Sequence, residues 1–185
     1  MRNIYVRKLV LAAMFFAIGL VLPFFIGQIP EISQKLLPLH LPVFLCSLIV
    51  GWRYGLAVGF FLPLVRSLLF SMPPLYPNAV AMAFEMAAYG FFAGFLYQLL
   101  LGMKLHKVAA LFSALIASMI IGRLAWGAVT YIMLQIDGSG FTFEAFLAGA
   151  VLNAVPGIIL QIVLIPTVIL ALDRAGVITA PAHGE

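Results

Sequence analysis

The sequence predicts an all-α integral membrane protein, a single bundle of six transmembrane helices over residues 1–185 with both termini in the cytoplasm. Composition is the first reason: 65% of the residues are hydrophobic and 9% are charged, whereas soluble domains carry roughly 25% charged residues. Length is the second, because 185 residues accommodate about six spans of about 20 residues each with short loops. The third is the placement of lysine and arginine.

Apolar stretches separated by turn residues and charges give the helices in order. Pro23 lies near the outer end of the first stretch, and Pro42 lies in the first turn of the second, where proline is tolerated. A proline-rich turn over residues 72–77 precedes the fourth stretch. Pro156 and Pro166 are expected to bend or divide the sixth. The predicted helices cover residues 6–27, 39–51, 54–70, 78–101, 108–134 and 142–172.

The basic residues predict the orientation, because cytoplasmic loops of membrane proteins are enriched in lysine and arginine. With the N-terminus inside, the outer segments contain only Lys35. The net charge of +4 therefore reflects span boundaries and not a nucleic-acid-binding face. The inner segments contain Arg2, Arg7, Lys8, Arg53, Lys104, Lys107 and Arg174.

Four polar side chains fall within the apolar stretches. Glu85 is the most unusual, since a carboxylate inside a span is costly and indicates a functional site. At about 1.5 Å per residue, Arg66, Glu85, Arg123 and Asn153 all lie in the outer half of their helices. Two interpretations remain open. The charges form an ion triad that locks the bundle, or their excess of one positive charge holds a bound carboxylate.

Further candidates surround this polar layer. His40 lies at the outer end of the second span, and Tyr76 and Asn78 lie in the turn before the fourth. His40 and Tyr76 are also typical of interfacial residues. Trp126 is one helical turn from Arg123, where its ring is placed to stack on a ligand. The predicted substrate-binding residues are Arg66, Glu85, Arg123, Asn153, His40, Tyr76, Asn78 and Trp126.

The sequence contains no catalytic motif, no predicted metal or cofactor site and no nucleotide-binding loop. Energy from ATP would have to come from another chain. Small residues spaced by four recur on several helices, including Ala13 and Ala17, and such stripes allow close helix packing. For most of them we expect packing within the chain, with a partner interface as the alternative.

The segment LPLHLPVFL, followed by GWRYGLAVGFFLPL and MPPLYPNAVAMAFEMAAYGFFAGFLY, resembles the S-components of energy-coupling-factor vitamin transporters. The resemblance implies a high-affinity vitamin-binding subunit in a prokaryotic cell membrane, with no enzymatic activity. It also implies docking onto a coupling protein and two ATPases, with Ala13 and Ala17 contacting the coupling protein. The chain is most similar to the pantothenate-type group. Riboflavin, pyridoxine, folate and a thiamine precursor stay open as substrates.

Two other functions remain as alternatives. A stand-alone secondary carrier for a small anion fits the polar layer, although the sequence lacks the inverted repeat common in such carriers. A small intramembrane enzyme would depend on Glu85 and His40 alone. Transport by the isolated chain without ATP would distinguish the carrier from the transporter subunit.

Overall fold

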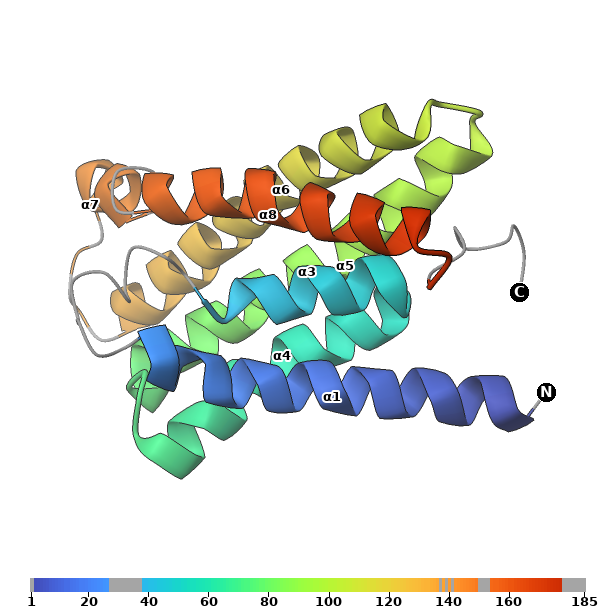
Figure 1. The fold of residues 1–185 in the computed structure, drawn as a ribbon. Helices are drawn as coiled ribbons and strands as arrows, with labels where there is room; N and C mark the ends of the chain where they lie inside the picture. Colours follow the sequence, from blue (N-terminus) through green and yellow to red (C-terminus); the bar gives the residue numbers. More distant parts are fainter. Residues whose placement is uncertain are drawn as a thin grey trace.

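The computed structural model describes residues 2–26, 38–136, 138, 140, 142–149 and 154–177. Regular secondary structure in these residues is entirely helical, as the sequence predicts, and the helices form one bundle (Figure 1). The elements are α1 (Arg2–Ile26), α3 (His40–Ile49), α4 (Trp52–Phe70), the π-helical turn η1 (Leu75–Ala79), α5 (Val80–Gly102), α6 (Lys107–Ile136), α7 (Phe143–Leu147) and α8 (Val155–Arg174).

Within the described ranges, five helical segments are long and apolar enough to cross a membrane. They are Ile4–Phe25, Trp52–Phe70, Leu75–Gly102, Lys107–Ile136 and Val155–Arg174. The second predicted span, residues 39–51, corresponds to α3, which has 10 residues. These rise about 15 Å, about half the hydrocarbon thickness of a bilayer. Most side chains of α3 are buried, so it lies inside the bundle.

In the range 142–172, predicted as one helix, the structure describes two helices. The short helix α7 ends at Leu147, and α8 begins at Val155. Pro156 lies in the first turn of α8, where its missing N–H removes no helical hydrogen bond. Pro166 lies inside α8, which continues to Arg174. Both prolines were expected to bend or divide this range. Pro156 marks the start of a helix, whereas Pro166 does not end one.

The helix α5 lies at the centre of the bundle, in contact with α3, α4 and α6. Its packing on α4 requires glycine on both helices. A Cβ built on Gly55 would lie 2.7 Å from the carbonyl oxygen of Gly90, and one built on Gly59 would lie 2.2 Å from that of Met86. The stripes formed by these glycines therefore serve packing within the chain, as the sequence predicts for most such stripes.

A serine of α3 forms hydrogen bonds to the face of α5 that contains Gly90. The Ser47 hydroxyl donates a hydrogen bond of 2.5 Å to the carbonyl of Gly90 and accepts one of 2.8 Å from the N–H of Gly94. Both hydrogen bonds are buried, so the Ser47 hydroxyl has a hydrogen-bond donor and an acceptor as partners without water. This junction places the start of α3 beside the part of α5 that contains Glu85 and Tyr89.

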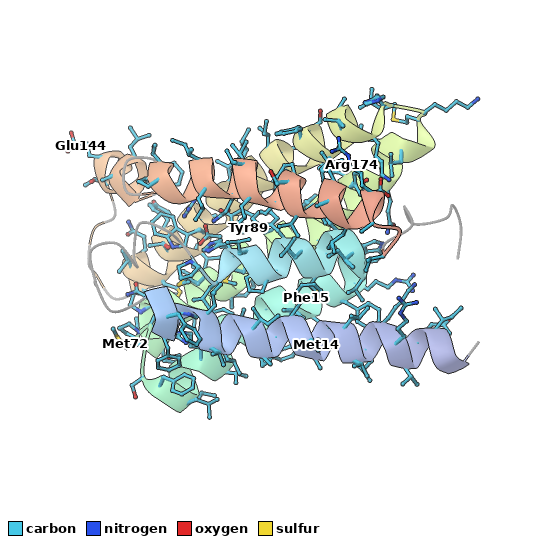
Figure 2. All side chains as sticks on the ribbon, in the orientation of Figure 1. Met14, Phe15, Met72, Tyr89, Glu144 and Arg174 are labelled. Atoms are coloured by element: carbon cyan, nitrogen blue, oxygen red, sulfur yellow. The ribbon has the colours of Figure 1, made fainter. Side chains whose placement is uncertain are left out.

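The two ends of the bundle differ in charge. Figure 1 shows the start of α1, the start of α4, the turn between α5 and α6, and the end of α8 at one end. That end contains Arg53, Lys104, Lys107 and Arg174, and Arg174 is labelled there in Figure 2. The Lys107 ammonium forms an ion pair with Asp173 across α6 and α8. Met72 and Glu144 lie at the opposite end (Figure 2).

Candidate functional site

A cavity of about 420 Å³ lies near the end of the bundle that contains Met72. Its size falls within the range of small-molecule sites, about 300–1,000 Å³. Helices α1, α3, α4, α5 and α6 all contribute to its wall, together with the proline-rich turn after α4. The described residues that line it are Pro23, Pro38, Leu39, His40, Arg66, Met72, Pro73, Pro74, Asn78, Met82 and Trp126.

Arg66 supplies a positive charge to this wall. It lies near the end of α4, and only 8% of its surface is exposed. Its Nη1 donates a hydrogen bond of 2.5 Å to the carbonyl of Leu20 in α1. The guanidinium carbon lies 4.9 Å from the ring centre of Phe24 and 5.4 Å from that of Phe70. Within the described part of the chain, Arg66 has no carboxylate partner.

Glu85 lies behind the cavity wall, in a closed cluster with three neighbours. Its Oε1 accepts a hydrogen bond of 2.7 Å from the Tyr89 hydroxyl, and Arg123 Nη1 lies 2.8 Å from the same oxygen. His40 Nε2 approaches it to 3.7 Å. Glu85 is 2% exposed and Arg123 is 14% exposed. The carboxylate thus joins α5 to α6 and lies close to the start of α3.

Aromatic packing holds this cluster in place. The Tyr89 ring lies 5.0 Å from Phe44 and 5.2 Å from His40, measured between ring centres. The ring also packs against Gly122, where a built Cβ would lie 2.1 Å from Tyr89 Cε1. A larger residue at position 122 would push the tyrosine away. The glycine therefore allows the Tyr89 hydroxyl to reach Glu85.

Trp126 completes the wall on the α6 side. It is one turn beyond the cluster, and its ring stacks on Phe146 of α7 with ring centres 6.3 Å apart and an interplanar angle of 26°. Among the described residues, no group of three or more His, Cys, Asp or Glu side chains is arranged to hold a metal ion. The arrangement is suited to holding a small molecule by contacts with one arginine, a few polar side chains and an apolar wall.

Residues 7–169 match the family described as ECF transporter, substrate-specific component. This chain belongs to that family. A substrate-specific component is the transport subunit of an energy-coupling-factor importer that binds its small-molecule substrate, and it works with a coupling module; it is not an enzyme. The match and the apolar helices together identify a multi-pass membrane protein. No curated protein and no solved structure gives a significant match.

In this substrate-specific component, the residues predicted to bind substrate separate into groups. Arg66, His40, Asn78 and Trp126 line the cavity. Glu85 and Arg123 are not among the lining residues and pair with each other. Tyr76 is 47% exposed, and its hydroxyl donates a hydrogen bond of 2.9 Å to the carbonyl of Met133. Asn153 lies outside the described residues, as does Lys35 of the predicted outer segments.

Several residues at the site of this substrate-specific component are not among the predicted substrate-binding residues. Tyr89 follows Glu85 by four residues, so the two side chains share one helix face, and this spacing was the available signal. Met82 lies one turn before Glu85 and lines the cavity. The contribution of Pro23 and of Leu39 to the wall depends on how α1 and α3 pack, which no local sequence pattern indicates.

Proposed function

We propose that this chain is the high-affinity binding subunit of an energy-coupling-factor importer for a B vitamin or a related small molecule, and that its substrate occupies the cavity at Arg66. The observation that carries the proposal is a vitamin-sized cavity with a buried arginine in its wall. Pantothenate is the best candidate, because its carboxylate suits a guanidinium and its body has hydroxyl and amide groups that Asn78 and Trp126 can contact.

The proposal also covers how the chain is oriented in the membrane. Six spans, with α3 completing the set, and both termini in the cytoplasm would place the basic end of the bundle inside the cell, in agreement with the enrichment of lysine and arginine in cytoplasmic loops. The cavity would then lie in the outer half of the membrane, where it can collect substrate from outside. The proposed location is the plasma membrane of a prokaryote.

Docking onto the coupling protein is assigned to α1. Ala13 and Ala17 are both exposed on this helix, and neighbouring exposed side chains are apolar, among them Met14, Ile18 and Val21. Small residues spaced by four let another helix approach closely. ATP hydrolysis would occur on two ATPase subunits, and this chain would carry no cofactor of its own.

Two measurements test the proposal. Mass spectrometry of the purified chain should identify a co-purifying vitamin or vitamin precursor, and calorimetry should show that it binds tightly. Liposomes that contain the chain, a coupling protein and two ATPases should accumulate this compound only when ATP is supplied. ATP-independent uptake by the chain alone would contradict the proposal and support the secondary carrier instead.

A further inference from the structure

We infer that the substrate is a monoanion without a positively charged group, and that Arg66 is the residue of the described wall that receives its negative charge. The Glu85–Arg123 pair then acts as a scaffold behind the wall and not as a part of the site that touches substrate. This inference rests on the proposed function, because it takes the cavity at Arg66 as the substrate site. It adds the net charge of the ligand, and it names Arg66 as the residue that selects for this charge.

The hydrogen bonds of Arg66 give the first step. A guanidinium has five N–H donors, and within the described residues one hydrogen bond, to the Leu20 carbonyl, is made. The side chain is more than nine-tenths buried and lines the cavity. A buried charge that lacks a counterion is costly, so an anion in the cavity would remove this cost and use the remaining donors.

The position of the guanidinium gives the second step. The ring centres of Phe24 in α1 and Phe70 in α4 lie 4.9 Å and 5.4 Å from the guanidinium carbon, and the Leu20 carbonyl accepts a hydrogen bond from one nitrogen. Arginine binds carboxylate through two parallel hydrogen bonds only when its plane is suitably oriented. Three contacts from two helices hold this plane before ligand arrives, which reduces the entropy lost on binding.

The neighbouring charges give the third step. The carboxylate of Glu85 already has Arg123 at 2.8 Å and the Tyr89 hydroxyl at 2.7 Å, and neither Glu85 nor Arg123 lines the cavity. No aspartate or glutamate occurs among the described lining residues. An ammonium group on the ligand would therefore meet Arg66 without a compensating carboxylate, which disfavours zwitterions and cations.

The rest of the described wall is mainly uncharged. Proline, leucine and methionine side chains make up much of it, and Asn78 and Trp126 add groups that can hydrogen-bond to a neutral ligand body. Methionine adapts to irregular shapes, so the apolar part of the wall can accept different aliphatic skeletons. The positive charge of Arg66 is then the main feature of the described wall that determines which ligands bind.

Matched pairs of compounds test the inference on the purified chain in nanodiscs. Each pair has a carboxylate and a neutral counterpart of nearly the same shape: pantothenate with pantothenol, nicotinate with nicotinamide, and biotin with biotinamide. Thiamine serves as the cation. For every pair in which either member binds, we expect the carboxylate to bind about 10- to 100-fold more tightly, the factor expected of hydrogen bonds to a charged group.

Variants then assign the preference to Arg66. Arg66→Gln should abolish the preference for carboxylate, and Arg66→Lys should keep part of it because the charge remains. Arg53→Gln is the matched control, since Arg53 lies on the same helix, is exposed and also lies over an aromatic ring, that of Trp52. This control should leave the preference unchanged. If Arg66→Gln does not fold, the compound pairs on the unaltered chain still decide the charge class.

The outcomes separate the two claims. Equal or tighter binding of the neutral member or of thiamine would overturn the inference and leave the proposed function intact. A carboxylate preference that survives in Arg66→Gln would overturn the assignment to Arg66. A chain that binds none of the compounds and retains no small molecule on purification would overturn the proposed function, and the inference with it.

Discussion

Glu85 shows how one carboxylate can be kept inside an apolar bundle. It is buried between α5 and α6, with a guanidinium and a phenol on the same oxygen. Such a pair need not add stability relative to apolar residues of similar size, because both charges lose their hydration. Losing one partner is different, since it leaves the other charge buried and unpaired.

Removing one member of this pair should therefore cost more than removing both. We expect Glu85→Leu and Arg123→Met each to lower the free energy of unfolding by about 3 kcal/mol or more, and the double variant to recover much of that loss. Thermal unfolding of the four proteins in one detergent measures this coupling. Additive losses in the double variant would show that the two side chains act independently.

The Lys107–Asp173 pair provides a control at the other end of the bundle. Its side chains are 30% and 27% exposed, so water screens their attraction. Asp173→Asn should cost no more than about 1 kcal/mol. A loss as large as that of Glu85→Leu would mean that burial is not what makes the inner pair sensitive.

At the scale of helices, the contact between α5 and α6 depends on the absence of a side chain at Gly122. The Tyr89 ring occupies the space that a Cβ would fill. Gly122→Ala should therefore displace the ring, weaken its hydrogen bond to Glu85 and destabilise the chain by about 1–3 kcal/mol, as overpacking does. Thermal unfolding measures the loss.

Gly140→Ala is the matched control for this substitution. A Cβ built on Gly140 meets nothing within 4 Å, so the variant should unfold at nearly the same temperature as the original chain. Equal stability of the two variants would contradict the close packing of Tyr89 on Gly122.

Composition and apolar stretches predicted an all-helical bundle, but not how each helix is rotated. A span that is apolar on all sides has no polar face to show which side is inward. The similar depths of Arg66, Glu85 and Arg123 followed from counting residues along each helix. That Arg123 and not Arg66 pairs with Glu85 depends on the rotation of α5 against α6, which is set by Gly122 and Tyr89 together. The start of α8 was signalled by Pro156.

At the scale of the whole molecule, α1 offers a test of assembly. Ala13→Trp and Ala17→Trp should leave substrate affinity unchanged and abolish ATP-driven uptake, because a bulky ring would hold the coupling protein away. Calorimetry and liposome uptake measure the two effects separately. Leu124→Trp, at a position 58% exposed on α6, is the control and should transport normally.

The orientation of the bundle can be measured with single cysteines. Cys46 is the chain's one cysteine and is buried, so Cys46→Ser gives a background without thiols. In intact cells, a membrane-impermeant maleimide should label Glu144→Cys. It should label Met103→Cys, at the basic end, only after the cells are permeabilised. The opposite pattern would place the termini outside.

The chain has two tryptophans, and they lie in different surroundings. Trp126 lines the cavity, whereas Trp52 begins α4 at the basic end, with its ring against Phe91 and Phe95. In a Trp52→Phe protein, all tryptophan fluorescence would come from the wall of the cavity. Its emission should shift when substrate replaces water there. Binding and release would then be visible in unlabelled protein, during a transport cycle as well as at equilibrium.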